Sequence, residues 1–155
     1  MRTFIYTLAV LAALLTGCKR QPPATPLSLY IVSTEKVDGG RYIDTPAFPK
    51  LGYIAATPDL IITSLEAVGP NEAGVAGNMK PGVVVMLHQV DAEKCAALSQ
   101  KAVYRKILFM VGDEPLTAPT IMVALDASQT RSLQLTVADE SQQKKVIADL
   151  TMLTR

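Results

Sequence analysis

The first eighteen residues decide how much of this chain is left to fold. Arg2 provides a positive charge, and residues 4–15 form an apolar run that only Thr7 interrupts. Two small residues then lead to Cys18. This order is typical of a secretory signal peptide, and about 12 apolar residues are too few to cross a roughly 30 Å hydrocarbon core comfortably as a helix. We therefore expect residues 1–17 to be removed on export.

The segment Leu15-Thr16-Gly17-Cys18 resembles the lipobox of bacterial lipoprotein precursors. The resemblance implies cleavage before Cys18, a thioether-linked diacylglycerol on its sulfur, and acylation of the new amino group, typically with palmitate. Two or more acyl chains, at about 0.8 kcal/mol for each buried CH₂, give stable attachment to the membrane. The alternative is an uncleaved anchor with an incidental cysteine.

The residue after the cysteine bears on which membrane holds the anchor. In Gram-negative lipoproteins an aspartate at this position usually retains the protein at the inner membrane. Here the position is occupied by Lys19, so the periplasmic face of the outer membrane is favoured.

The remaining chain divides into a linker and one candidate domain. Residues 18–26 contain three prolines, which favour extended polyproline geometry and hold the domain roughly 25 Å from the lipid. Residues 27–155 have a length that suits a single domain with one core. Loss of Arg2 leaves 14 of the 15 Lys and Arg against 14 Asp and Glu, so the charge does not favour a nucleic-acid partner.

Apolar runs and turn residues predict the order of strands and helices in the domain. We expect strands over residues 27–33, 59–68, 83–87, 107–111, 116–125 and 132–137. Asp91 and Asp139 each precede apolar residues at helical spacing and are predicted helix N-caps. From Val83 onward the order is strand, helix, strand, strand, strand, helix. It predicts an α+β fold with two helices on one face of a mainly antiparallel sheet.

Three stretches between these elements have a different character. Residues 41–58 contain three prolines and several aromatic residues, and we interpret them as an ordered wrap over the core. Residues 69–82 hold four glycines and two prolines, which predicts a mobile loop or a long hairpin connection. Residues 126–130 are expected to form a polar turn.

The first two of these stretches are candidates for partner binding, because loops on a rigid scaffold often carry function. Tyr42, Phe48 and Tyr53 are the candidate side chains in the first stretch. Their alternative role is to cover the core, and the alternative role of residues 69–82 is simply to connect two strands. Pro119 interrupts a predicted strand and so indicates a sheet edge or a bulge. An exposed edge there could accept a strand from a partner protein.

Residues that carry enzyme chemistry are scarce. His88 is the only histidine and has no Gly-x-Ser-x-Gly motif beside it, so a hydrogen-bonded structural role is expected. Cys95 lacks a disulfide partner once Cys18 is lipidated, and is expected to be buried in the core. The acidic pairs at residues 113–114 and 139–140 lie where turns and helix starts favour carboxylates.

The motifs for metals and cofactors are also missing from the sequence. One histidine and one buried cysteine do not make a zinc site, and no glycine-rich phosphate-binding motif occurs. Tryptophan is absent, so stacking of sugars or bases is unsupported. We expect no catalytic residue, no metal and no cofactor.

The order of elements in the second half carries a family resemblance. Residues 91–99 read DAEKCAALS, residues 106–113 read KILFMVGD, and residues 114–121 read EPLTAPTI. This series resembles the head subdomain of the first periplasmic domain of SecD, an accessory subunit of protein export, where a strand of the form Leu-Ser-Ala-Pro-x-Ile follows a helix, a strand and a turn. The resemblance covers residues 59–152. It implies an α+β domain of the kind that handles emerging preprotein in SecD.

The chain also departs from SecD in two respects. SecD has transmembrane helices that use the proton gradient, whereas no apolar run of that length follows Cys18 here. The glycine-rich stretch of the family is replaced by residues 126–131. The sequence therefore predicts a stand-alone, lipid-tethered relative of the SecD head.

Three functions are compatible with these features. The first is a non-enzymatic module of the cell envelope that binds a protein or peptide in the periplasm. The second is an immunity lipoprotein that neutralises a secreted antibacterial toxin. The third is an envelope hydrolase, which would require His88 or an acidic pair in an open cleft.

Overall fold

The computed structural model describes residues 24–71 and 80–155. The elements in these ranges are β1 (Leu27–Ile31), β2 (Arg41–Thr45), β3 (Phe48–Ile54), β4 (Leu60–Ile62), β5 (Ala67–Asn71), β6 (Gly82–Met86), α1 (Gln89–Lys101), β7 (Ile107–Val111), β8 (Glu114–Thr117), α2 (Ala127–Thr130), β9 (Ser132–Thr136) and α3 (Glu140–Thr151). None of the described helices combines the length and hydropathy that a bilayer crossing requires. The predicted signal peptide, Cys18 and most of the linker lie outside the described residues, as does much of the predicted loop over residues 69–82.

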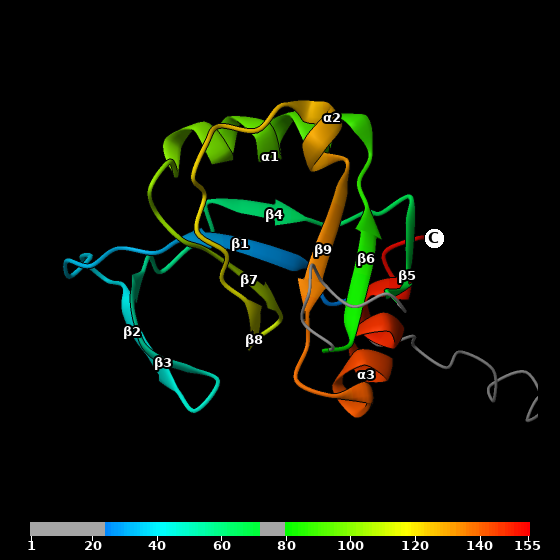
Figure 1. Ribbon diagram of the computed structural model, residues 1–155, viewed down its shortest axis with the longest axis horizontal. Helices are drawn as coiled ribbons and strands as arrows, with labels where there is room; N and C mark the ends of the chain where they lie inside the picture. The colour runs from blue at the N-terminus through cyan, green and yellow to red at the C-terminus, as the bar shows by residue number, and fades with distance from the viewer. Residues whose placement is uncertain (1–23, 72–79) are drawn as a thin grey trace, which may run out of the picture.

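A four-stranded antiparallel sheet, in the order β4-β1-β7-β8, forms the centre of the fold (Figure 1). In its register Leu27 lies opposite Val111, and Ile31 lies opposite Ile107. The central strands β1 and β7 are nearly continuous apolar runs, and nearly all their residues are buried. Such runs are typical of strands that are covered on both faces.

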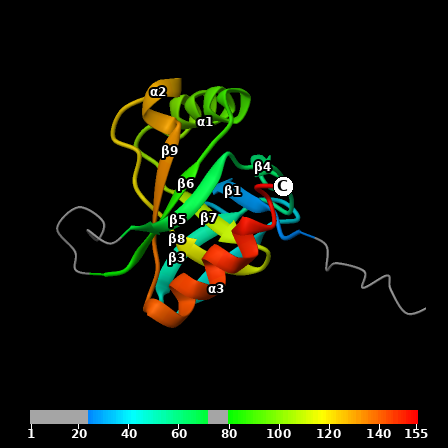
Figure 2. The same ribbon diagram turned by 90° about the vertical axis from the view of Figure 1, so that its right-hand side faces the viewer.

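One face of this sheet is covered by the second sheet, β5-β6-β9, and by the two long helices. The larger apolar cluster joins both sheets, α1 and α3, among others through Leu29, Val85, Leu98, Phe109 and Leu150. Figure 2 shows α3 running along the side of the molecule, where it contacts β5, β6 and β7. Both helices contribute to this one cluster, so the predicted α+β fold with two helices on one face of an antiparallel sheet is confirmed.

The opposite face is covered by the β2–β3 hairpin. Ile43 and Ile54 of the hairpin pack with Tyr30, Leu108 and Met110 from the central strands. Residues 41–58 therefore do cover the core, as expected, but much of this stretch forms a regular hairpin and not an irregular wrap.

The prolines of this stretch are compatible with the hairpin because of where they lie. Pro46 lies in the turn, and Pro49 is exposed on a strand of a two-stranded sheet, where a missing N–H need not break a ladder. Gly52, with a φ of 133°, lets the hairpin approach the end of β1 closely. A Cβ at this position would lie 2.6 Å from the carbonyl oxygen of Ser33.

The strand predicted over residues 59–68 is wrong as a single element. It is divided into β4 and β5, which belong to different sheets. Between them Leu65 is 2% exposed, and its N–H donates a hydrogen bond to the carbonyl of Leu153 at 2.9 Å. Burial of Leu65 against the C-terminal end of the chain therefore accompanies the change of sheet.

The two predicted helix caps have different outcomes. Asp139 is the N-cap of α3, and its side chain accepts a hydrogen bond from the N–H of Gln142 at 2.8 Å. The prediction for Asp91 is wrong, because α1 begins at Gln89, two residues before Asp91, and its N-cap is His88, which makes no side-chain capping hydrogen bond. Asp91 lies in the first turn and pairs with Lys94 at 2.8 Å.

The region after β7 also differs from the prediction. The strand expected over residues 116–125 ends at Thr117, and only isolated bridges continue the pairing. In place of the turn predicted over residues 126–130, Ala127–Thr130 form the short helix α2. Asp126 is its N-cap and completes a capping box with Gln129. The predicted burial of Cys95 is confirmed: its thiol is free, and the residue is 5% exposed.

Candidate functional site

The predicted binding residues Tyr42 and Tyr53 lie opposite each other on the hairpin. Their rings are 4.8 Å apart between centroids and tilted by 55°. Tyr42 is 47% exposed, whereas Tyr53 is half-buried and its backbone pairs with Ser33. The neighbouring Ile43 and Ile54 face the core, so the tyrosine pair lies on the outer face of the hairpin.

Phe48 lies at the turn of the hairpin, where it meets an edge of the central sheet. It packs against the smaller apolar cluster and lines a groove of about 410 Å³. We call this opening the β8 groove, and its lining residues are Ala47, Phe48, Lys80, Pro115, Leu116, Thr117, Thr136, Val137, Ala138 and Gln142. The groove therefore runs between the edge strand β8, the end of β9 and the first turn of α3.

Pro119 lies just beyond this groove and is exposed. Its carbonyl accepts a hydrogen bond from the N–H of Ile107 at 3.0 Å, so this segment still follows β7. The structure places the edge strand of the sheet at β8 and brings Phe48 to it. Tyr42, Tyr53 and Pro119 are not among the residues that line the β8 groove.

Glu114 fixes β8 to the first turns of α3 beside the groove. Its carboxylate accepts a hydrogen bond from Gln142 Nε2 at 2.8 Å and pairs with Lys145. The hydrogen bonds from Gln142 and Lys145 hold the pKa of Glu114 below its usual value. The acidic pairs thus have structural contacts, as the sequence predicts: Asp139 caps α3, and Asp113 lies 3.8 Å from Arg41.

A second opening was missed by sequence reasoning. It has a volume of about 620 Å³ and is lined by Val32, Ser33, Thr34, Glu35, Leu51, Tyr104, Arg105, Lys106 and Thr120. Tyr104 follows α1 and is 77% exposed. The sequence contains a signal here, an aromatic residue followed by two basic ones, but the predicted helical spacing continues through it to Lys106.

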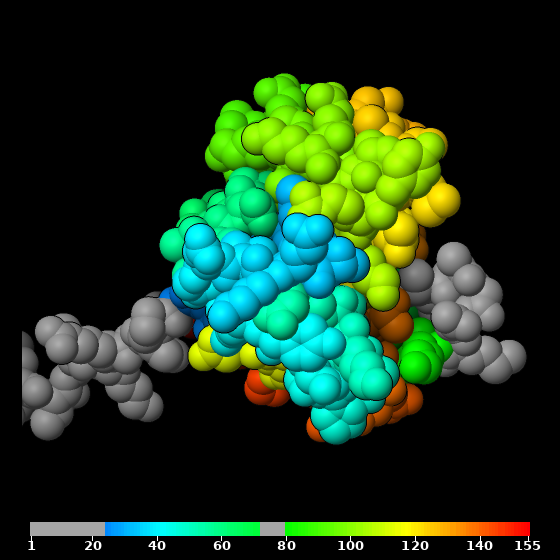
Figure 3. All heavy atoms as spheres, turned by 90° about the vertical axis from the view of Figure 1, so that its left-hand side faces the viewer, coloured from blue at the N-terminus to red at the C-terminus, as the bar shows by residue number. Residues whose placement is uncertain are grey.

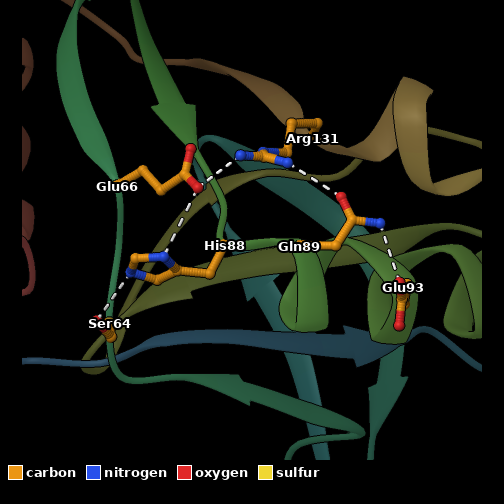
Figure 4. Close-up of polar contacts among 6 residues, drawn as sticks. All are labelled: Ser64, Glu66, His88, Gln89, Glu93 and Arg131. Atoms are coloured by element: carbon orange, nitrogen blue, oxygen red, sulfur yellow. Dashed lines mark hydrogen bonds and ion pairs between the residues drawn. The ribbon is translucent and has the colours of Figure 1, made fainter.

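A polar network surrounds His88 on another part of the surface (Figure 4). Ser64 Oγ lies 3.2 Å from His88 Nε2, and His88 Nδ1 lies 3.7 Å from Glu66 Oε1. Arg131 Nη2 lies 2.5 Å from the same Glu66 oxygen, and Arg131 Nη1 donates to Gln89 at 3.0 Å. The network therefore links the β4–β5 loop, the end of β6, the start of α1 and the start of β9.

The order serine, histidine, glutamate invites comparison with a hydrolase triad. The 3.7 Å separation of His88 and Glu66 exceeds a hydrogen bond. Arg131 is the principal partner of Glu66 and lowers the pKa of its carboxyl. None of the openings described above includes Ser64, His88 or Glu66 in its lining. We therefore interpret these contacts as structural links between elements.

No metal centre is formed by the part of the chain that the structure describes. No group of three or more His, Cys, Asp or Glu side chains converges in residues 24–71 and 80–155. The arrangement that the structure does offer is an edge strand beside an open groove, which suits noncovalent contact with another chain.

The fold resembles a SecD periplasmic domain. The chain is similar to the crystal structure of SecDF in its super-membrane-facing form, with a TM-score of 0.60 and 13% identity over 85% of this chain and 19% of that one. A second SecDF structure, described as a membrane component that enhances protein export, matches with a TM-score of 0.56 and 14% identity over 99% of this chain and 71% of that one. The resemblance predicted from the sequence is confirmed.

The two matches cover most of this chain but differ in how much of the SecDF chains they cover. Both cover more of the chain than residues 59–152 could supply, so the structural likeness reaches beyond the part with sequence resemblance. The chain spans only about a fifth of the first SecDF chain, and at such identities the likeness is one of fold alone. No protein-family model and no curated protein matches the sequence.

Proposed function

We propose that this chain is a lipid-anchored module of the cell envelope that binds an extended segment of another protein on the periplasmic side. The observation that carries the proposal is the β8 groove. An edge strand has backbone groups that an extended segment can pair with, and a neighbouring pocket can take its side chains. At the β8 groove the pocket wall is provided by Leu116, Val137 and the ring of Phe48.

Two further features support this proposal. The similar SecDF protein is described as a membrane component that enhances protein export, which favours a setting in the envelope for a related fold. The segment ending in Cys18 supplies the anchor, and the linker over residues 18–26 supplies the reach. In this proposal the module neither transports nor catalyses, and its partner approaches β8 from the periplasm.

Site-specific photo-crosslinking in intact cells tests the proposal. A photo-reactive phenylalanine analogue replaces Thr117 on β8 and, as a matched control, Ala97 on the exposed side of α1. We expect protein adducts from position 117 and few from position 97. Equal labelling at both positions, or no adduct at position 117 despite normal protein levels, would contradict binding at the β8 groove.

A further inference from the structure

Three large apolar side chains are exposed together at the end of α1. Tyr104, Met122 and Val123 are 77%, 61% and 64% exposed. They are brought together because the N–H of Tyr104 donates to the carbonyl of Ile121 at 2.7 Å, directly before Met122. Figure 3 views the molecule from the side of the hairpin, and its upper part is formed largely by α1 and the segment that follows it, in green to yellow-green. An exposed apolar group of this kind is typical of an interaction site.

The backbone of Tyr104 is in an unusual conformation. Its φ of 62° lies in the left-handed region, which residues other than glycine, asparagine and aspartate seldom adopt. The ring is largely in solvent, so packing of the ring against the core does not account for this conformation. Residues with strained backbone of this kind cluster at functional sites.

Basic side chains border these apolar residues. Lys101, Arg105 and Lys106 are exposed, and none of them forms an ion pair within the described residues. Arg105 and Lys106 also line the 620 Å³ opening, whose one acidic lining residue is Glu35. The local charge is therefore net positive, and it complements an acidic partner.

The position of this patch relative to the tether favours a protein partner over the anchoring membrane. Leu27 at the start of β1 lies opposite Val111, whereas the far end of β1 reaches Lys106 through the N–H of Val32 at 2.9 Å. The chain thus enters the domain at the opposite end of β1 from the patch. This inference rests on the proposed anchor at Cys18, because an N-terminal anchor places the Leu27 end of β1, and not the Lys106 end, toward the membrane.

We propose that residues Lys101, Tyr104, Arg105, Lys106, Met122 and Val123, here called the Tyr104 surface, bind an acidic peptide segment that carries apolar side chains. The cations contact its carboxylates, and the apolar side chains of the peptide pack against Tyr104 and Met122 and enter the adjacent opening. This docking surface is separate from the β8 groove, since the two sets of residues have no member in common.

Fluorescence anisotropy tests the proposal with the full lipidated chain held in phosphatidylcholine nanodiscs. The probe is a fluorescein-labelled 12-residue peptide in which Glu alternates with Leu and Phe. We expect saturable binding that weakens at least tenfold in Tyr104→Asn, and at least tenfold in the double variant Arg105→Glu, Lys106→Glu. Asparagine accepts the left-handed backbone, so the first variant removes the ring without new strain.

The controls separate this surface from general stickiness. Val90→Ser removes another exposed apolar side chain at the far end of α1, and it should leave binding unchanged. A peptide with Lys in place of Glu should bind at least tenfold more weakly. Circular dichroism melting should give the same Tm for wild type and Tyr104→Asn.

Three results would overturn the proposal. The first is an unchanged peptide affinity in Tyr104→Asn. The second is a loss of peptide affinity in Val90→Ser as large as that in Tyr104→Asn. The third is tighter binding of the chain to phosphatidylglycerol vesicles than to the peptide, if that vesicle binding is lost in Tyr104→Asn. Crosslinking at Thr117 does not depend on Tyr104, so failure of the Tyr104 surface and failure of the β8 groove are distinguishable.

Discussion

The hydroxyl of Ser99 accepts a hydrogen bond from the backbone N–H of Leu125 at 2.8 Å, although the two residues are 26 positions apart. Ser99 lies in α1 and is 1% exposed. A second buried hydroxyl, Thr130 Oγ1, donates to the carbonyl of Ala92 at 2.7 Å. These two contacts hold the segment between β8 and β9 against α1. The exposed Met122 lies in this segment.

Replacement of Ser99 by alanine is expected to destabilise the fold. It would leave the N–H of Leu125 without its partner in a half-buried position, which costs about 1–3 kcal/mol. Urea unfolding followed by circular dichroism measures the change in the free energy of unfolding. Gln100→Ala is the matched control on the exposed side of α1 and should change it by less than about 0.5 kcal/mol.

The β2–β3 hairpin is expected to be an integral part of the fold. Ile54, on the core-facing side of the hairpin, is fully buried, so Ile54→Ala should lower the free energy of unfolding by about 2–5 kcal/mol. Tyr42→Ala, on the exposed face of the same hairpin, should cost less. Similar and small losses for both variants in denaturant melts would indicate that the hairpin is a detachable cover.

The contacts of Glu114 predict a dependence of stability on pH. Because its folded-state pKa is lowered from 4.5, the stabilisation is present above that value and is lost as the pH falls through the folded-state pKa. The carboxylate is 34% exposed, so the effect should be below about 1 kcal/mol. Glu114→Gln should therefore unfold more easily than wild type at pH 7.

Unfolding at acid pH provides the control for this prediction. Once Glu114 is protonated in the wild type, both proteins carry a neutral side chain at this position. The difference between their unfolding midpoints should then disappear well below pH 4.5. A difference that is constant from pH 7 down to pH 3 would show that the ionised carboxylate is not the cause.

The thiol of Cys95 is expected to be inert in the folded protein. Burial raises its pKa to about 12, so hardly any thiolate exists at pH 8, and the thiolate is the reactive form. Ellman's reagent should not titrate this thiol in the native lipidated protein and should titrate it fully in guanidinium chloride. Rapid native reaction would contradict the packing of α1 against the sheets.

Lipidation at Cys18 is tested by metabolic labelling. Cells given an alkyne-tagged palmitate should label the wild-type chain, whereas Cys18→Ser should not be labelled and should leave the membrane fraction. Sucrose-gradient separation of inner and outer membranes then tests the role of Lys19. We expect Lys19→Asp to move the wild-type outer-membrane signal toward the inner membrane.

Sequence reasoning was most successful for elements with a strong pattern of their own. The continuous apolar runs of β6 and β7 and the Asp139 cap of α3 can be recognised locally, because an apolar run and a capping carboxylate are visible in neighbouring residues of the chain. It failed where a local pattern permits two outcomes. An apolar stretch such as residues 59–68 reads as one strand, and nothing nearby shows that Leu65 must turn toward Leu153.

The candidate sites follow the same division. The aromatic ring of Phe48 among prolines can be recognised in the sequence. Its place beside β8 depends on how the β2–β3 hairpin packs on the central sheet, which joins residues about 65 positions apart. Tyr104 is not found from the sequence because the helical spacing continues past it to Lys106, and its hydrogen bond to Ile121 is a contact between distant segments. Side-chain type is thus visible in the chain, while proximity and exposure are not.

The sequence by itself determined the α+β class, because strand and helix patterns are local. It also predicts the export signal with Cys18 and the scarcity of catalytic groups, since these predictions rest on local pattern and composition. The tertiary structure alone decided that residues 59–68 are divided between two sheets and that a hairpin covers the second face of the central sheet. It also decided that β8 lies at a sheet edge and that Tyr104 is exposed. The physical reason is that edges, grooves and exposed patches are set by which strands pair and which faces pack. Those choices minimise the exposed apolar area of the whole chain and not of any one segment.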